Sequence, residues 1–473
     1  MTTNPREPSP PAPPAARPPA QQSKLQRLRQ ELVSASVVLP SIRVGGFVTE
    51  VTPAFCRVSG LSNFLKLGET VNLSNGRRSQ IGEVVRIDEH GATIKPFDAV
   101  LNAGLGAPAW RHGLVTITPH TSWKGRILDA LGKPIDGAGP LIHGDAAVQT
   151  DQEPPPPMRR RRVSMPIKTG VRVIDLFTPL CAGQRIGIFA GSGIGKSTLL
   201  AMLARSRGFD TAVIALVGER GREVREFIED ALGDRGRAVA VVSTGDESPM
   251  MRRLAPKTAL SIAEYFRDRG ENVLLIVDSV TRFAHAAREV SLAAGEPPVA
   301  RGYTPSVFSD LPKLLERAGP GEENAGTITG IFSVLVDGDD HNEPIADSIR
   351  GTLDGHIVLD RATADQGRYP AVNILTSVSR LANAIWTPEQ RGLIMKLKAM
   401  IAQFEDTRDL RLMGGYHRGT DPELDKAIEL VPRILEAMKQ NPADPPSTDA
   451  FQEMAQALRA AVSEDKTNER ERS

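Results

Sequence analysis

The feature that most constrains this chain is a glycine-rich turn that joins an apolar run to a helical pattern. The apolar run ends at Phe189, and the helical pattern opens at Lys196. The glycines of the turn let backbone N–H groups close around phosphate oxygens, and the start of the helix adds the positive end of its dipole. A strand, such a turn and a helix in this order form a P-loop, which predicts a nucleotide site. The turn comprises Gly191, Ser192, Gly193, Ile194, Gly195, Lys196, Ser197 and Thr198.

Two side chains of the turn carry the chemistry. We expect Lys196 to reach the β- and γ-phosphates of ATP, and Ser197 to give its hydroxyl to the Mg²⁺ ion that screens the triphosphate. The other residues from Gly191 to Thr198 are expected to line the phosphate cradle. The strict motif has glycine where this chain has Ala190, but a methyl group is tolerated at a strand exit if φ is negative. A chance glycine turn is the alternative, and it would not require both flanking patterns.

Residues 165–380 alternate apolar strands with helical patterns. This alternation is typical of a largely parallel sheet with crossover helices, and so of an α/β domain. The expected strands are Arg185–Ala190, Ala212–Val217, Ala238–Ser243, Val273–Val277, Thr327–Val336 and Val372–Leu375.

Two carboxylates follow strands of this expected sheet. The apolar run 272–277 ends in Asp278, which would lie beside Ser197 and hold Mg²⁺ through water. Glu219 follows the strand after the P-loop helix, close to the expected γ-phosphate, where it would polarise the attacking water. The alternative for Glu219 is a solvated loop acid among several charged neighbours.

The segments on either side differ in character. Residues 1–22 hold eight prolines and almost no large apolar side chains, which predicts a disordered arm. From Ser23 to Val33, leucines at helical spacing predict a short amphipathic helix that packs on its own domain or on a partner or lipid surface.

Residues 41–117 show short β-type runs between turn signals such as Asn75-Gly76 and His90-Gly91, which favours a small β-barrel. Residues 383–439 are helical in pattern, with Ile394, Leu397, Ile401 and Phe404 on one face; a proline-rich linker and a last helix from Ala450 to Val462 follow.

Composition limits the choice of partner and compartment. Lys and Arg total 58 against 57 Asp and Glu, so no global charge draws the chain to nucleic acid. The run Arg159–Arg162 is the local exception, but no aromatic residue interleaves it, and we favour a solvated or interface-bound run. Cys56 and Cys181 lack metal or redox spacing, and no apolar run of about 18 residues occurs, so we expect a cytoplasmic protein.

Five segments of the chain form a combined signature: Gly191–Ser197, Gly218–Arg220, Asp278–Arg282, Tyr369–Ala371 and Ser377–Arg380. Together they resemble the ATP synthase α/β family of rotary and hexameric ATPases. The likeness covers about residues 35–440, and within it residues 301–319 are similar to the flagellum-specific (type III export) ATPases, with the virulence-secretion ATPases next.

The resemblance implies the fold class. It is an α/β P-loop (RecA-like) central domain with an N-terminal β-barrel and a C-terminal helical domain. The expected parts are a disordered arm and helix over 1–34, the barrel over 35–117, the ATPase domain over 118–380, the helical domain over 381–440, and a linker, short helix and charged tail over 441–473.

The resemblance also implies roles for single residues. Glu219 matches the water-polarising glutamate, and Arg220 in the same segment joins the catalytic candidates. Arg380 matches an arginine finger that a neighbouring subunit supplies. Because one chain has both Glu219 and Arg380, identical copies in a hexamer would complete one another's sites. Tyr369 would lie against the adenine, or alternatively pack in the core.

The resulting hypothesis is a homohexameric, Mg²⁺-dependent ATPase that energises flagellar type III protein export at the cytoplasmic face of the inner membrane. The implied partners are a stator-like regulator, a central stalk-like protein, the membrane export gate, and export chaperones and substrates, with peripheral membrane contact and no nucleic acid. Three alternatives stay open: a virulence-type secretion ATPase, a hexameric nucleic-acid translocase, and a non-catalytic subunit of a rotary ATPase. Residues 41–117 lack the clustered aromatics that a translocase would need, and Glu219 argues against a non-catalytic subunit.

Overall fold

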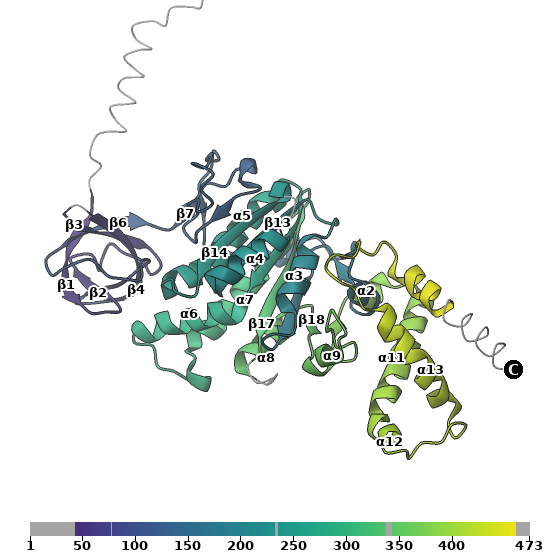
Figure 1. The fold of residues 1–473 in the computed structure, drawn as a ribbon. Helices are drawn as coiled ribbons and strands as arrows, with labels where there is room; N and C mark the ends of the chain where they lie inside the picture. The colour runs from purple at the N-terminus through teal and green to yellow at the C-terminus, as the bar shows by residue number, and fades with distance from the viewer. Residues whose placement is uncertain (1–42, 77, 232–234, 337–342, 460–473) are drawn as a thin grey trace, which may run out of the picture. The chain divides into compact units, whose positions relative to one another are not determined.

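The computed structural model describes residues 43–76, 78–231, 235–336 and 343–459 (Figure 1). The proline-rich arm and the helix expected from Ser23 to Val33 lie outside these residues. By its internal contacts the chain divides into two units at Gly45, and every element below belongs to the second unit.

Six strands form the expected β-barrel, closed in the order β1-β2-β5-β4-β3-β6. Its interior is filled by alternate residues of the strands, such as Val48, Val58 and Ile94. The sequence missed β6, because Ala109 is the only fully buried residue among its six and no apolar alternation results. The strands are β1 (Gly45–Val51), β2 (Cys56–Ser59), β3 (Thr70–Asn75), β4 (Arg78–Asp88), β5 (Gly91–Pro96) and β6 (Pro108–Gly113).

The connector between the barrel and the P-loop contains short elements. One of them, β8 (Ile127–Leu128), pairs in parallel with β14 and so extends the central sheet, which the turn-rich sequence did not indicate. The arginine run contacts the chain's own residues: the guanidinium of Arg160 lies 3.2 Å from the Glu316 carboxylate, and Arg161 donates to the Gly326 carbonyl at 3.2 Å. The other short elements are β7 (Thr116–Ile117), η1 (Thr121–Trp123), β9 (Val148–Gln149), η2 (Pro157–Arg159), β10 (Pro166–Ile167), α2 (Arg172–Phe177) and β11 (Leu180–Cys181).

The central sheet has the order β19-β18-β12-β17-β15-β13-β14-β8, and its strands from β18 to β8 pair in parallel. Five of the expected strands are confirmed. The strands are β12 (Arg185–Ala190), β13 (Thr211–Glu219), β14 (Ala238–Thr244), β15 (Asn272–Asp278), β17 (Thr327–Leu335), β18 (Gly355–Val358) and β19 (Val378–Ser379), and β16 (Gly319–Pro320) pairs with β17.

The sixth expected strand, Val372–Leu375, is wrong. Val372 forms only a single bridge to Leu359. The side chain of Asn373 then accepts from the backbone N–H groups of Leu375 and Thr376, which turns the chain away from the sheet. The position beside β12 is taken instead by β18, which is only four residues long.

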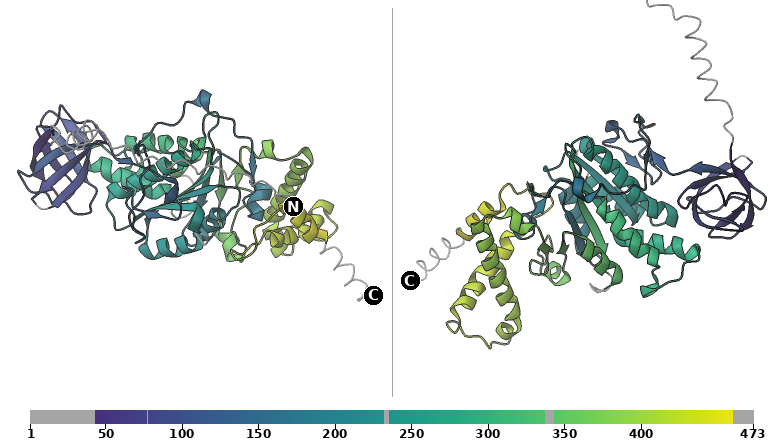
Figure 2. Two further views of the ribbon diagram at one scale, coloured as in Figure 1. Left: turned by 90° about the horizontal axis from the view of Figure 1, so that it is seen from above. Right: turned by 180° about the vertical axis from the view of Figure 1, so that it is seen from behind.

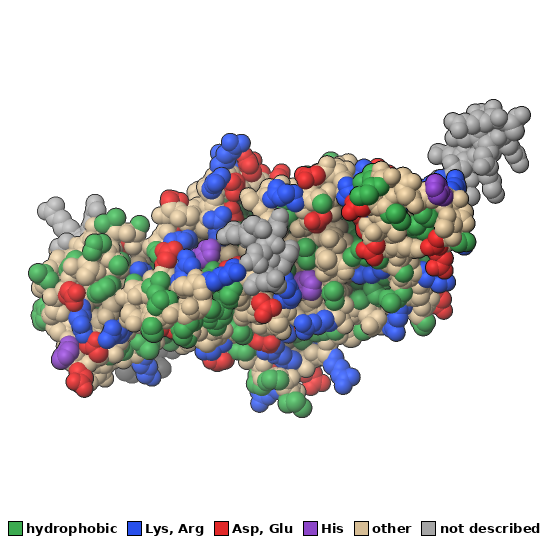
Figure 3. Space-filling model, turned by 90° about the horizontal axis from the view of Figure 1, so that it is seen from below, with side chains coloured by type: hydrophobic (Ala, Val, Ile, Leu, Met, Phe, Trp, Pro, Cys, Tyr) green, Lys and Arg blue, Asp and Glu red, His purple; other side chains and the backbone are tan. Residues whose placement is uncertain are grey.

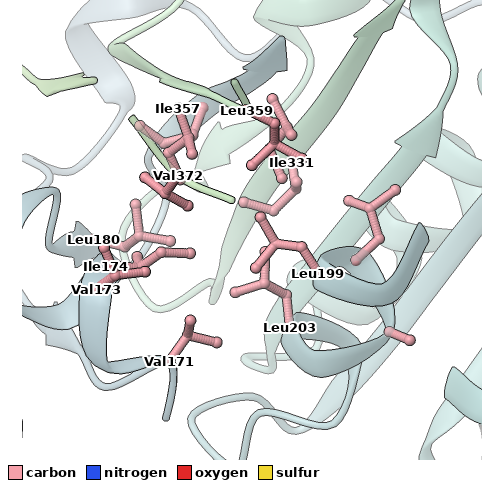
Figure 4. Close-up of a cluster of buried hydrophobic side chains, with 14 of the residues drawn as sticks. Val171, Val173, Ile174, Leu180, Leu199, Leu203, Ile331, Ile357, Leu359 and Val372 are labelled. Carbon is pink, nitrogen blue, oxygen red and sulfur yellow. The ribbon is translucent and has the colours of Figure 1, made fainter. Parts of the chain in front are cut away.

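Helices cover both faces of the sheet because its strands alternate their buried side chains between two cores. One core joins Ile188 and Ile214 to α2, α3 and α4, and the other joins Phe189 and Val213 to α5, α6, α7 and α8. Figure 4 shows Leu199 and Leu203 of α3 directed at Ile331 of β17, which fixes the helix that follows the P-loop. The helices are α3 (Lys196–Ala204), α4 (Gly221–Ala231), α5 (Pro249–Arg267), α6 (Val280–Ala293), η4 (Ala300–Gly302), α7 (Pro305–Glu316), α8 (Pro344–Thr352) and α9 (Arg361–Asp365).

The C-terminal part is helical, as expected. Figure 2 shows its two long helices, α11 and α13, side by side in yellow-green. Ile394, Leu397 and Ile401 of α11 are buried, and a capping box of Thr387 and Gln390 begins the helix. The elements are α10 (Ala382–Ile385), α11 (Pro388–Asp406), α12 (Arg408–Leu412) and α13 (Pro422–Ala437), and residues 450–459 are helical.

The surface mixes charges of both signs. On the face drawn in Figure 3, Lys and Arg side chains are interspersed with Asp and Glu. Among the helices in the described ranges, none has the length and apolar composition that crossing a membrane would need.

Candidate active site

The P-loop lies where β12 ends and α3 begins. Gly193 and Gly195 have φ values of 78° and 87°, in the left-handed region that favours glycine. Ile194 between them is buried in the core and anchors the loop. Ala190 is still part of β12, where it pairs with Leu335 of β17, so its methyl group faces the core without disturbing the turn.

Lys196 lies between two carboxylates. Its ammonium contacts the Asp278 carboxylate directly and lies 3.8 Å from Oε1 of Glu219. The lysine is the first residue of α3, whereas the carboxylates are the last residues of β15 and β13. Because parallel strands end at one edge of a sheet, three side chains from distant parts of the sequence meet beside the P-loop.

Asp278 is held rigidly, with 2% of the residue exposed. Besides Lys196 it accepts a hydrogen bond of 2.5 Å from the hydroxyl of Ser333 in β17. Ser197 and Thr198 are exposed on the first turn of α3. A serine hydroxyl and a carboxylate are hard oxygen donors of the kind that Mg²⁺ uses together with phosphate oxygens and water, so these residues fit that ion. Across the described ranges, no group of three or more His, Cys, Asp or Glu side chains is arranged to hold a metal by itself.

Glu219 is buried, with 9% exposed, and is not a solvated loop acid. Burial raises the pKa of its carboxyl group, and the nearby Asp278 carboxylate raises that pKa further, while Lys196 and Arg282 oppose both effects. Arg282 Nε lies 3.5 Å from Glu219 Oε1, and the same guanidinium donates to the Gly218 carbonyl at 2.6 Å. Arg282 therefore holds the end of β13, which carries Glu219.

Sequence reasoning did not name Arg282 as a site residue, although it quoted the segment from Asp278 to Arg282. A signal was available: Arg282 is four residues after Asp278, which puts it on the first turn of a helix that starts at the same sheet edge. Arg220 directly follows Glu219, but its side chain is exposed and lies 3.5 Å from Glu223.

The segment from Asp360 to Pro370 borders the P-loop. The Arg361 guanidinium donates to the Ser192 carbonyl at 3.0 Å. Tyr369 is 44% exposed, and its ring lies beside Gly195, 3.3 Å from where a Cβ atom would stand. Tyr369 is thus at the cradle and not in the core, whereas Arg361 carried no signal in the sequence.

Arg380 lies apart from the other candidates. Its backbone N–H donates to the Asp354 carbonyl at 3.0 Å, and the Asp354 carboxylate accepts at 3.0 Å from the backbone N–H of Arg185, the first residue of β12. The P-loop follows Ala190 at the other end of that strand, roughly 16 Å away at about 3.3 Å per residue. Arg380 is exposed at the amino edge of the sheet, while its own P-loop is at the carboxyl edge.

Comparison with known proteins identifies the family of this chain. Residues 170–379, which contain the P-loop, both carboxylates and Tyr369, match the profile described as ATP synthase alpha/beta family, nucleotide-binding domain. A flagellum-specific ATP synthase of Agrobacterium fabrum is 56% identical over 423 residues, which are 89% of this chain and 89% of that protein. The chain belongs to the ATP synthase α/β family. It is an ATPase of the type III export branch of this family, and its flagellum-specific relatives indicate the flagellar role.

The C-terminal part and the whole fold of this ATP synthase α/β family member are also similar to type III secretion ATPases. Residues 386–460 match the profile described as T3SS EscN ATPase C-terminal domain. The assembled ATPase EscN from the type III secretion system of enteropathogenic E. coli has a TM-score of 0.82 at 38% identity, covering 88% of this chain and all of that chain. EscN in complex with its central stalk EscO has a TM-score of 0.79 at 37% identity, with the same coverage.

Proposed function

We propose that this ATPase acts as a homohexamer that hydrolyses Mg²⁺-ATP and thereby energises flagellar protein export. The observation that carries the proposal is the meeting of Lys196, Glu219 and Asp278 at the carboxyl edge of the sheet, directly beside the P-loop. One cation and two acids with largely buried side chains suit phosphoryl transfer to water, because that reaction needs charge neutralisation, a metal ligand and a group that orients the water.

Each residue has a distinct part in this mechanism. Lys196 would leave its carboxylate partners and neutralise the β- and γ-phosphates, while the backbone N–H groups from Gly191 to Gly195 hold the phosphate oxygens. Ser197 and Asp278 would hold Mg²⁺, which when bound would supply positive charge to the triphosphate. Glu219 would accept a hydrogen bond from the attacking water. Its raised pKa makes it a stronger proton acceptor than an ordinary glutamate.

The location of Arg380 supports a ring. An arginine at the amino edge of the sheet does not reach the P-loop of its own subunit, yet it is exposed and free to enter a neighbour's site. We infer that Arg380 stabilises the charge that develops on the γ-phosphate in the adjacent copy. We assign Arg220 to the same interface, since it is exposed directly after Glu219. Tyr369 would pack on the adenine, since its ring lies exposed beside the loop that holds the phosphates.

One solved relative supports a partner for this ring. EscN forms a complex with the central stalk EscO, so we propose a stalk-like protein as a partner of this ring as well. We further propose a stator-like regulator, the export gate, and export chaperones and substrates as partners, with the ring on the cytoplasmic face of the inner membrane.

The test compares the full-length protein with Lys196→Ala. We expect Mg²⁺-dependent ATP hydrolysis by the wild type, loss upon chelation of Mg²⁺, and a rate reduced at least 100-fold in the variant, because the P-loop loses the side chain that neutralises the β- and γ-phosphates. Secretion of flagellar subunits by cells that carry only the variant should fail. Substantial turnover by Lys196→Ala would overturn the assignment of the site.

A further inference from the structure

Arg361 contacts the backbone of the P-loop. Arg361 is the first residue of α9, and its guanidinium donates to the Ser192 carbonyl at 3.0 Å. The N-cap residue Asp360 fixes the start of this helix by accepting from the backbone N–H and the hydroxyl of Thr363, at 2.9 and 2.8 Å. The arginine therefore extends from a well-defined helix start.

Both ends of this contact are set by neighbouring strands. β12 leads into the P-loop and β18 leads into α9, and the two strands pair in parallel from Gly187↔His356 to Phe189↔Val358. This register brings Arg361 to the level of Ser192, although the two residues are far apart in sequence. The pairing of β12 with β18 therefore positions the two residues for this contact.

The contact acts next to Gly193, where the loop has open space beside it. A phosphate cradle needs its backbone N–H groups directed inward, which directs carbonyl groups outward. Ile194 is buried and anchors one side of the loop, but no atom lies within 4 Å of the position that a Cβ on Gly193 would occupy. A hydrogen bond from a guanidinium is roughly twice as strong as a neutral one. Ser192 and Arg361 are both exposed, so this hydrogen bond lies at the surface and removing it would leave the packing of the hydrophobic core unchanged.

We propose that Arg361 is a positioning residue for nucleotide binding: it holds the Ser192 carbonyl outward and so keeps the P-loop in its phosphate-binding shape. This inference rests on the proposed function of the P-loop as the ATP site. It assigns Arg361 no contact with the reacting atoms, so its loss should weaken binding more than it slows the chemical step.

The test uses two variants. Arg361→Met keeps most of the length of the side chain and removes every hydrogen-bond donor. Arg361→Lys keeps the positive charge and replaces the guanidinium with an ammonium donor. Arg391→Met is the matched control, because Arg391 is also exposed and also donates to a backbone carbonyl, that of Asn383 in the C-terminal helical part, at 2.5 Å. The measurements are the Kd for a fluorescent ADP derivative, KM and kcat for ATP, and the Tm without nucleotide.

For Arg361→Met we expect Kd and KM to rise about tenfold, with kcat within about threefold of wild type and Tm unchanged. Arg361→Lys should recover part of the affinity, and Arg391→Met should match wild type. A Kd within twofold of wild type would overturn the proposal. So would a tenfold loss of kcat at constant KM, which would place Arg361 in the chemistry, or a lowered Tm, which would make its role structural. Failure of the proposed function is distinguishable, because Lys196→Ala would then bind and hydrolyse nucleotide as well as wild type does.

Discussion

At the scale of single residues, the charged side chains of the candidate site are held in place by their partners. Lys196 satisfies two acids at once, and each acid is fixed by a second partner, Ser333 for Asp278 and Arg282 for Glu219. When phosphate binds, Lys196 would therefore exchange its carboxylate partners for phosphate oxygens, and no mobile side chain would have to move into the site. Such preorganisation is the main way in which proteins accelerate phosphoryl transfer.

Glu219→Gln separates chemistry from binding. We expect a kcat about 10²–10⁴-fold lower, because the amide is a poor proton acceptor, while the Kd for ATP stays within about threefold since the phosphate cradle is untouched. Single-turnover hydrolysis and equilibrium binding on the same preparation provide the measurement. If binding and hydrolysis are lost together, Glu219 has a structural role.

At the scale of elements, the link between α5 and the end of α7 depends on a buried ion pair. The guanidinium of Arg317 donates to both carboxylate oxygens of Glu264, at 2.9 and 2.7 Å, and to the Thr150 carbonyl at 2.7 Å. Their side chains are 2% and 4% exposed, so neither charge has solvent as an alternative partner.

Arg317→Met should therefore destabilise the protein by about 3–5 kcal/mol, because it leaves the Glu264 carboxylate buried and unpaired. Adding Glu264→Met should restore a large part of the loss, since both charges are then removed. Urea denaturation measures both effects. Arg222→Met, which removes an exposed i,i+4 pair on α4, should leave the transition almost unchanged. An equal loss in the single and double variants would contradict this account.

The helices and strands also show which parts of the fold can be predicted from sequence patterns. Strands that are buried on both faces, such as β12, β13 and β15, are continuous apolar runs and could be predicted. β6 and β18 could not, because only Ala109 is fully buried in the first, and the second is only four residues long and includes His356. Glu219 and Asp278 were predictable because each ends such a run. Arg361 was not, since its contact with Ser192 depends on strand order, which local patterns do not contain.

At the scale of the whole molecule, the proposed ring requires that each site be shared by two copies. We expect Lys196→Ala and Arg380→Ala each to be nearly inactive alone, the latter by about 10³–10⁵-fold, because an arginine finger contributes that much. Mixed before assembly in equal amounts, they should regain activity at roughly a quarter of the sites, those where an intact P-loop meets an intact finger from the next copy. A mixture no more active than its components would refute the shared site.

The placement of the P-loop and Arg380 at opposite edges of one sheet has a consequence for assembly. In the proposed ring, such a subunit would have one donating side and one receiving side, so its contacts would be head-to-tail and would all point the same way around the ring. Every copy would then assist one neighbour and be assisted by the other, which would make the ring a directed cycle. A single copy without Arg380 would silence its neighbour on one side only, and the occupancy of each site can influence its neighbours with a fixed sense of rotation.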